Sequence, residues 1–296
     1  MKYTNKQNLP EALYQAIVND PYKKGSDFSA SELPTPPQIR VLKQRYDDKI
    51  TIDVADLIYP LIGNNTHYIL ERIGIKNGLQ EERLSWKFWS GFTVSGKLDF
   101  YDSMNVLWDY KVTTRYVLID GVKPEWEAQL NTNALLLKLH NFTVASAKIC
   151  TIFRDWSKIQ AVKNPDYPKN QVVVLSARLW SMEESESYIN ERVKLHYQSE
   201  YAPDDQLPKC TSKERWEKPT VYAVMKKGRK SSVRNLESLK DAQAYIKNKH
   251  LDAKVHTIQK RLGESTRCEY YCDVKSFCNQ YKELKTVITS DTSREN

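Results

Sequence analysis

The sequence predicts an α/β protein, with a mixed central β-sheet flanked by helices and a C-terminal segment that carries clustered cysteines. From residue 51 to residue 201 the hydrophobic periodicity follows the order helix, strand, strand, helix, strand, strand, helix, which is typical of an α/β domain. Near residue 203 the composition changes to a linker-like stretch with prolines and a cysteine. We therefore expect an N-terminal extension over residues 1–50, a core over 51–202 and a C-terminal segment over 203–296.

Composition and charge narrow the class of protein. Of the 296 residues, 40% are hydrophobic and 28% are charged, as in a globular protein that buries a sizeable core. The chain has no run of about 18 apolar residues, and its N-terminus lacks a signal-peptide stretch. We therefore expect a cytoplasmic protein with no membrane partner. The formal net charge of +8 suits a polyanionic partner such as nucleic acid.

The first predicted helix of the core lies within residues 51–75. His67 and Glu71 follow Gly63 at intervals of four residues, so the three share one face of the helix. Pro60 indicates that the regular helix begins or is kinked there. We expect an apolar face beside them, made of Ile58, Ile62, Ile69 and Ile73.

A hairpin follows this helix. Residues 92–101 and 106–112 alternate between apolar and polar side chains, and a turn-like Asp-Ser-Met-Asn sequence joins them. An odd-length connection places Asp99 directly opposite Asp109, and Lys111 points to the same side as Asp109. We expect one apolar and one polar face.

The remaining elements are predicted from the same signals. Pro124 suits the first turn of a helix, and the last dozen residues are polar and are expected to be disordered. In chain order we predict a short basic helix within 39–46, a helix over 123–142, strands over 145–156 and 171–180, an exposed charged helix over 181–201, and a strand, basic turn, strand and helix over 220–249.

The two aspartates and the lysine of the hairpin suggest metal chemistry. Carboxylates that face each other repel, so the pairing of Asp99 with Asp109 gains nothing on a bare surface. A divalent cation such as Mg²⁺ removes that penalty and can activate water for phosphodiester hydrolysis, assisted by the ammonium of Lys111. On these residues alone, a solvated sheet face with incidental charges is the favoured interpretation.

The order of the motifs resembles the PD-(D/E)XK nuclease superfamily, in particular its RecB-like branch, which includes CRISPR-adaptation and phage exonucleases. The resemblance covers roughly residues 28–282. Its motifs are GNNTHYILE on the helix, SGKLDF and WDYK on the hairpin, and WEAQLN on the next helix, while SASELPTPPQIRVLK resembles the entry segment of the phage-type members. The family implies a restriction-endonuclease-like core.

The resemblance also implies roles for single residues. The metal ligands would be His67, Asp99, Asp109 and the backbone carbonyl of Tyr110, and the ion would be Mg²⁺ or Mn²⁺. Lys111 would be the catalytic lysine, and Gln129 would match the glutamine of the family's Gln-x-x-x-Tyr motif.

Three further residues bear on this assignment. Asn133 stands where the motif has tyrosine, which is a departure from the family pattern. Glu71, one turn after His67, is expected to support the site as an acceptor. Arg115 is either a phosphate contact or a plain surface charge.

The cysteines predict a second metal site. Cys268, Cys272 and Cys278 form a Cys-x3-Cys-x5-Cys pattern, and such clusters in a cytoplasmic protein suggest metal rather than disulfides. Zinc knuckles favour Cys-x2-Cys spacing, whereas iron–sulfur clusters accept looser spacings. Several RecB-like nucleases carry an iron–sulfur cluster whose last three ligands lie near the C-terminus, and the C-terminal segment of this chain is similar to theirs. We expect a structural [4Fe–4S] cluster with Cys210 as its fourth ligand, zinc being the alternative and Cys150 a core residue.

The expected function is that of a metal-dependent DNA exonuclease acting at DNA ends in recombination, repair or phage DNA processing. The basic stretch from Lys226 to Arg234, near Trp216 and Tyr222, either follows a DNA backbone or is merely solvated. No phosphate-binding loop of the ATPase type is present, so a helicase, recombinase or single-strand-binding partner is possible. The alternatives are a non-catalytic DNA-binding module and a structure- or sequence-specific endonuclease.

Overall fold

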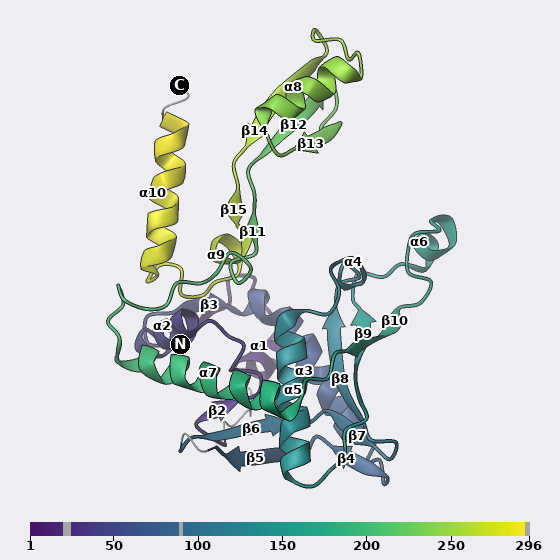
Figure 1. Cartoon of the computed structure of the whole chain (residues 1–296), viewed down its shortest axis with the longest axis vertical. Coiled ribbons are helices and arrows are strands. Elements are labelled where there is room, and N and C mark those ends of the chain that lie inside the picture. Colours follow the sequence, from purple (N-terminus) through teal and green to yellow (C-terminus); the bar gives the residue numbers. More distant parts are fainter. Residues whose placement is uncertain (20–24, 89–90, 294–296) are drawn as a thin grey trace. The chain divides into compact units, whose positions relative to one another are not determined.

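The computed structural model describes residues 1–19, 25–88 and 91–293 (Figure 1). The chain forms two compact units, which we call unit 1 and unit 2. Unit 1 comprises Met1–Pro37 and Thr51–Tyr201, and unit 2 comprises Gln38–Ile50 and Ala202–Asn296. The segment expected as an N-terminal extension, residues 1–50, is thus divided between the two units.

Unit 1 contains the strands and helices predicted for the core, together with several short elements. Its helices are α1 (Glu11–Val18), the 3-10 helix η1 (Val54–Leu57), α3 (Ile58–Glu71), α4 (Val117–Asp120), α5 (Pro124–Leu139), α6 (Lys158–Lys163) and α7 (Met182–Tyr201). Its strands are β1 (Lys2–Thr4), β2 (Phe28–Ser29), β3 (Thr51–Asp53), β4 (Gly78–Gln80), β5 (Arg83–Lys87), β6 (Thr93–Lys97), β7 (Phe100–Asp102), β8 (Val106–Thr113), β9 (Ser146–Phe153) and β10 (Val172–Ala177).

The strands of unit 1 form mixed sheets. A five-stranded sheet has the order β10-β9-β8-β7-β4, in which β8 and β9 are parallel and the other neighbours are antiparallel. A three-stranded sheet has the order β2-β6-β5, and β1 pairs with β3. The prediction of an α/β protein with mixed sheets flanked by helices is confirmed at this level.

Helix α5 is the centre of the core of unit 1. Nearly every residue from Ala128 to Leu137 is buried, as expected for a helix that is packed on more than one side. One apolar cluster joins it to the five-stranded sheet through Leu107, Leu130 and Ile149. A second joins it to β6 and α7 through side chains that include Leu135. Pro124 is the first residue of the helix, as predicted.

The prediction of a single strand over residues 92–101 is wrong. It consists of β6 and β7, which belong to different sheets. The chain turns at Leu98 and Asp99, where the Leu98 N–H donates to the carbonyl of Glu82 and the Asp99 carbonyl accepts from the Glu81 N–H. The predicted register survives this break, because Phe100 pairs with Trp108 and the same register places Asp99 level with Asp109.

The prediction that the polar face of the hairpin is exposed to solvent is also wrong. Leu107 is buried, Asp109 is 4% exposed and Thr113 is buried, so this side of β8 faces the protein interior. Trp108 and Tyr110, on the other side, are half-buried. The apolar clusters around α5 decide this, because they cover the side of β8 that carries Leu107.

Two helices differ from the prediction in burial. No residue of α3 is buried, and Ile62, Ile69 and Ile73 are exposed, so the predicted apolar face is not part of the core. Helix α7 was expected to be exposed, yet Ile189 and Val193 are fully buried on one of its faces. The many charged residues of α7 favoured the prediction of an exposed helix, but its apolar residues lie on one face and pack in the core.

Unit 2 combines one early segment with the C-terminal third of the chain. Its helices are α2 (Pro37–Arg45), which enters it at Gln38, α8 (Leu239–Asn248), α9 (Thr266–Tyr270) and α10 (Asn279–Ser293). Its strands are β11 (Glu217–Lys218), β12 (Val221–Lys226), β13 (Arg234–Leu236), β14 (His256–Arg261) and β15 (Glu264–Ser265). The predicted disorder of the last dozen residues is wrong as far as Ser293, where α10 ends, and the final three residues lie outside the described part.

Helix α2 is held within unit 2 by contacts with distant segments. The ring of Tyr46 stacks on that of Phe277 with centroids 4.3 Å apart, and the Tyr46 hydroxyl donates to Asp204. Arg45 forms an ion pair with the same aspartate. These contacts explain why residues 38–50 group with the C-terminal segment. In the described residues, no helix combines the length and the apolar character needed to cross a membrane.

Candidate metal centre and cysteine pocket

The candidate centre begins at a bend shared by two antiparallel strand pairs. Arg83 of β5 pairs with Lys97 of β6, and Gln80 of β4 pairs with Phe100 of β7. Both strand pairs break between these positions, and the common register places Glu81 opposite Asp99. Glu81 has a φ of 53°, which is uncommon for a residue other than glycine. The bend thus brings two carboxylates to one level.

His67 of α3 completes a group of three potential ligands. Its Nδ1 lies 3.4 Å from Glu81 Oε1 and 3.5 Å from Asp99 Oδ1. The ligating atoms of these three residues all lie within 4.8 Å of one another. The side chains of Glu81 and Asp99 are 4% and 10% exposed, and that of His67 is 31% exposed. The group is therefore partly buried but open on the side of the histidine.

Asp109 lies beneath this group and is almost fully buried. Its Oδ1 accepts a 2.9 Å hydrogen bond from Lys111 Nζ. Its Oδ2 is buried and has no hydrogen-bond partner. A buried, unpartnered carboxylate oxygen is costly, so this atom has an unfilled capacity for a cation.

Lys111 and Gln129, which the resemblance assigns to one site, are in contact. Lys111 Nζ also donates to Gln129 Oε1 at 3.3 Å, so the ammonium is held between α5 and the β8 strand. The backbone N–H of Tyr110 donates to Asp99 Oδ2 at 2.7 Å. That bond links β8 to the bend and fixes the orientation of Asp99.

The electrostatics of the centre reflect burial of like charges. Burial and the neighbouring Asp109 raise the pKa of Asp99 to about 7. Burial raises the pKa of Asp109 too, against the attraction of Lys111. The hydrogen bond with Glu81 raises the pKa of His67, although burial opposes it. Burial acts to raise the pKa of Glu81, but hydrogen bonds from His67 and Lys97 outweigh it and the pKa is lowered.

Glu81 and Lys97 are the residues of this centre that the sequence analysis missed. Lys97 Nζ lies 2.7 Å from Glu81 Oε2. Glu71, expected as the acceptor beside His67, instead points toward Lys97 at 3.9 Å and is half exposed. The signal for Glu81 was the register of the β5–β6 hairpin, which extends to place it opposite Asp99, but the strands 78–80 and 83–87 had not been predicted.

Asn133 packs closely against Gly96. A Cβ atom added to Gly96 would lie only 1.9 Å from Asn133 Oδ1 and 3.0 Å from Leu136 Cδ1. Asn133 is buried, and its Nδ2 donates to the Lys97 carbonyl at 3.4 Å. The asparagine thus packs α5 closely against β6. A tyrosine ring would need more room at this position than the present packing leaves.

Arg115 has a structural partner. Its backbone N–H and its guanidinium both donate to the Asp155 carboxylate, at 2.9 and 3.0 Å. Its guanidinium also lies 5.0 Å from the centre of the Tyr167 ring. These contacts fix the loop after β8, so Arg115 is not an unpaired surface charge.

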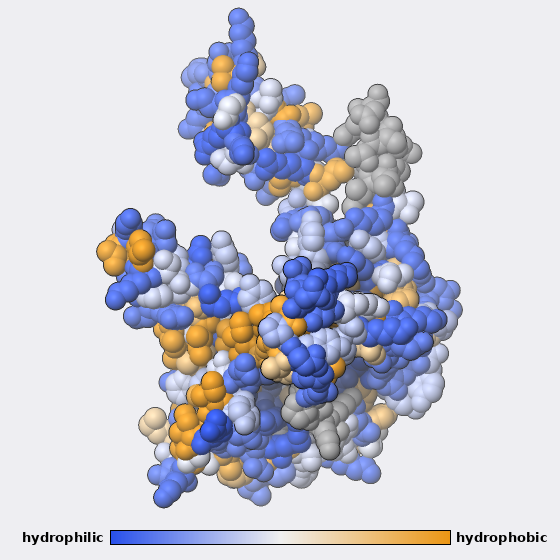
Figure 2. Space-filling view, turned by 180° about the vertical axis from the view of Figure 1, so that it is seen from behind, coloured by the Kyte–Doolittle hydropathy of each residue, from blue (hydrophilic) through white to orange (hydrophobic). Residues whose placement is uncertain are grey.

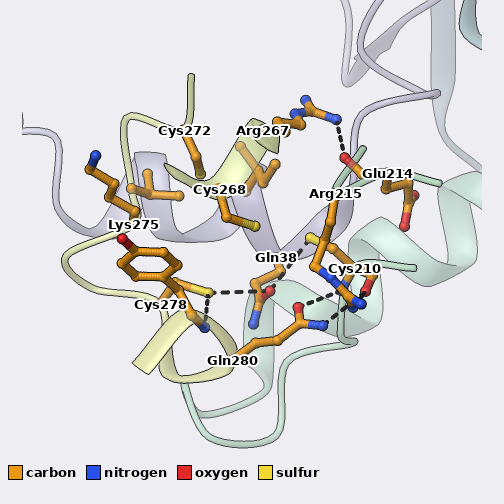
Figure 3. Close-up of a pocket in the computed structure, with 13 residues that line it drawn as sticks. Gln38, Cys210, Glu214, Arg215, Arg267, Cys268, Cys272, Lys275, Cys278 and Gln280 are labelled. Carbon is orange, nitrogen blue, oxygen red and sulfur yellow. Dashed lines mark hydrogen bonds between the residues drawn. The ribbon is translucent and has the colours of Figure 1, made fainter. Parts of the chain in front are cut away.

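The second candidate site is a pocket in unit 2 (Figure 3). Cys210, Cys268, Cys272 and Cys278 all line it, and none is in a disulfide. Gln38 of α2 lies between two of them. Its Oε1 accepts from the thiols of Cys210 and Cys278, each at 3.6 Å. Cys150 lies elsewhere, half-buried on β9.

Burial favours the protonated form of the thiols in this pocket, and cationic side chains line its walls. Burial raises the pKa of Cys210 to about 12 and that of Cys268 to about 11. Arg215, Arg267 and Lys275 also line the pocket. A bound metal would displace the thiol protons, and the cations would then offset the charge of the thiolates.

Comparisons with known proteins leave the family open. No family model and no curated protein matches the chain. One solved structure, the crystal structure of SSO0001, resembles it distantly, with a TM-score of 0.42 and 13% sequence identity over 66% of this chain and 93% of that one. A likeness at this level carries no argument about fold or function.

Proposed function

We propose that the protein is a metal-dependent deoxyribonuclease that hydrolyses phosphodiester bonds at DNA ends. The observation that carries this proposal is the buried Asp109, whose Oδ2 has no partner while Asp99 and the Lys111 ammonium lie beside it. Two carboxylates held together in the interior are unfavourable unless a proton or a cation lies between them. A role in binding alone needs no such arrangement.

The donor set fits a hard divalent cation. Asp99, Asp109 and His67 would hold Mg²⁺ or Mn²⁺, with the backbone carbonyl of Tyr110 as a further ligand and Glu81 as an additional carboxylate within reach. Oxygen donors with one imidazole suit Mn²⁺ and Mg²⁺ better than soft metals. When bound, such an ion lowers the pKa of a coordinated water and neutralises charge on the phosphate.

The chain's own residues would orient the reaction. Lys111, held by Asp109 and Gln129, presents a fixed positive charge where negative charge develops on the phosphate. Glu81 holds the His67 ring through Nδ1. Lys97 in turn neutralises Glu81. The resemblance of these motifs to the PD-(D/E)XK superfamily supports the same roles.

We propose a [4Fe–4S] cluster for the cysteine pocket, on Cys210, Cys268, Cys272 and Cys278. A single tetrahedral zinc ion with bonds near 2.3 Å needs sulfurs about 3.8 Å apart. Among the described residues, only the group of His67, Glu81 and Asp99 has its ligating atoms within 4.8 Å of one another. The thiols of the pocket do not form such a group of three, which supports the larger cluster, whose role would be to stabilise unit 2.

The exonuclease is favoured over two alternatives by particular features. The Asp109 environment argues against a non-catalytic DNA-binding module. A sequence-specific endonuclease would need a recognition domain, and we assign none. Because the chain has no ATPase loop, we propose that a helicase, recombinase or single-strand-binding protein supplies or protects the DNA end in the cytoplasm of a bacterial or phage-infected cell.

One experiment separates these functions. Purified protein and its Asp109→Asn variant are incubated with Mn²⁺ and either end-labelled linear DNA or covalently closed circular DNA. We expect the wild type to shorten the linear DNA only, and the variant to leave both intact. Cutting of the circle would support the endonuclease, and no degradation of either substrate by the wild type would reject the nuclease. Iron and zinc analysis of the same sample tests the cluster.

A further inference from the structure

The positive charge of this protein is concentrated in one part of unit 2. Residues 219–263, which we call the arm, carry 11 lysines and arginines against three acidic residues. The chain as a whole has 45 against 37, so the remaining residues carry 34 of each sign. The entire net charge of +8 therefore belongs to the arm. A neutral body with one cationic module indicates a local polyanion-binding surface rather than a general property of the chain.

The arm is a folded body and not a solvated loop. Strands β13, β12 and β14 form an antiparallel sheet in that order, and α8 contacts all three strands. Ala223, Val224 and Ala242 are fully buried between these elements. The charged side chains are thus presented on a defined scaffold, which limits the entropy lost when they bind a partner.

The turn between β12 and β13 presents three exposed lysines. Lys226, Lys227 and Lys230 surround Gly228, whose φ of 81° forms the turn. In the described part of the chain, no carboxylate forms an ion pair with any of these three lysines. Their charges are available for phosphate oxygens, which Lys and Arg bind without regard to base sequence.

A pair of exposed aromatic residues lies at the base of the arm. Strands β11 and β15 pair there. Trp216 directly precedes β11, and Tyr271 directly follows α9, the helix after β15. Their rings are 5.4 Å apart, and the side chains are 44% and 66% exposed. The Arg267 guanidinium lies 5.6 Å from the Trp216 ring. Exposed aromatic rings with an arginine are typical of surfaces that stack unpaired bases.

We infer that residues 216–271 form a binding surface for single-stranded DNA, in which the arm holds phosphates and the Trp216–Tyr271 pair stacks bases. This inference rests on the proposed function only for its biological meaning, which is the capture of an unpaired strand at a DNA end. An anionic membrane is a poorer partner, because Leu239 is the only exposed large hydrophobic residue among the described residues of the arm. The face of the arm seen in Figure 2 is mostly hydrophilic.

The test measures binding of the full chain without cleavage. Wild-type protein in EDTA is titrated into labelled single strands and duplexes of about 30 nucleotides at salt concentrations of about 50 to 200 mM, and binding is followed by fluorescence anisotropy. The arm variant carries Lys226→Gln, Lys227→Gln and Lys230→Gln. The matched control carries Lys158→Gln, Lys163→Gln and Lys194→Gln, which removes the same charge from exposed positions of unit 1.

The two parts of the surface give different signatures. Loss of three phosphate contacts on a single strand lowers the slope of log affinity against log salt by about 2, so we expect this change in the arm variant and none in the control. Trp216→Ala and Tyr271→Leu each lower single-strand affinity about tenfold with the salt slope unchanged, and affect duplex binding less.

Several results would overturn the inference. Equal weakening by the arm variant and its control would show that only net charge matters. If the aromatic variants lost affinity equally for single strands and duplexes, Trp216 and Tyr271 would not stack unpaired bases. Binding to anionic vesicles in place of DNA would identify a membrane partner. Because binding is measured without cleavage, DNA binding in EDTA together with no DNA degradation in the Mn²⁺ assay would reject the proposed function and leave this inference standing.

Discussion

The two candidate sites of this molecule use opposite ligand chemistry and differ in what holds them together. The centre of unit 1 gathers oxygen atoms and one imidazole at a bend in its sheets. The pocket of unit 2 gathers four thiols from segments that are distant in the chain. Hard ligands suit an exchangeable Mg²⁺ or Mn²⁺, whereas thiolates form lasting bonds to soft metals. One site is therefore suited to chemistry and the other to structure.

The largest expected effect separates the two sites through Asp109. Asp109→Asn removes a proposed metal ligand, so we expect DNA hydrolysis to fall by about 10³-fold or more. Iron content is expected to stay at the wild-type level, because the pocket lies in the other unit. DNA hydrolysis and iron content are measured on one preparation. Loss of iron together with loss of hydrolysis would mean that the two sites are not separate.

The converse variant is Cys268→Ser. We expect it to lose iron and to lower the unfolding temperature of unit 2, because metal binding energy is also folding energy. Mn²⁺ binding at the unit 1 centre, followed by calorimetry, should remain. Cys150→Ser is the matched control and should retain all of its iron. Retention of iron by Cys268→Ser would remove that residue from the ligand set.

Lys111 gives a smaller effect within the unit 1 centre. Lys111→Ala removes the ammonium but no proposed ligand, so we expect the rate at saturating Mn²⁺ to fall by about 10²-fold. Mn²⁺ affinity should be kept or slightly increased, because a neighbouring positive charge is lost. A large fall in Mn²⁺ affinity would show that Lys111 acts by organising Asp109 rather than by contacting the phosphate.

The protonation of the unit 1 centre predicts how metal-free stability depends on pH. The pKa of Asp99 is raised to about 7 in the folded state from its ordinary value of 3.8, so the folded state binds more protons between these values. The contribution of Asp99 to stability should therefore fall as pH rises from about 4 to about 7, against the opposite contribution of Glu81, whose pKa is lowered. The raised pKa values of Asp109 and His67 act in the same direction. Thermal unfolding in EDTA should show this slope, and Asp99→Asn should flatten it.

The smallest effect concerns the packing behind that centre. Gly96→Ala forces Asn133 or Leu136 to move, and overpacking of this kind costs about 1 to 3 kcal/mol. We expect a lower free energy of unfolding in urea, and partial recovery when Asn133→Ala is added. An additive loss in the double variant would show that the two residues are not in contact.

Local sequence patterns are enough to predict several features of this protein. Pro124 fixed the start of α5, and the turn between β7 and β8 fixed the register that places Asp99 level with Asp109. The spacing of Asp109 and Lys111 put both on one side of a strand, since side chains alternate along β-structure. The clustered cysteines pointed to one site before any fold was known.

Two features depend on packing between distant segments, namely the side of β8 that is buried and the residues that join the site. Helix α5 covers the side that carries Leu107 and Asp109, and local periodicity cannot reveal this, because burial depends on packing between distant segments. The bend that brings Glu81 to Asp99 requires two strand pairs to break at the same level. In unit 2, the same long-range packing places Gln38 among thiols more than 170 residues away in the chain, a distance over which no sequence pattern carries a signal.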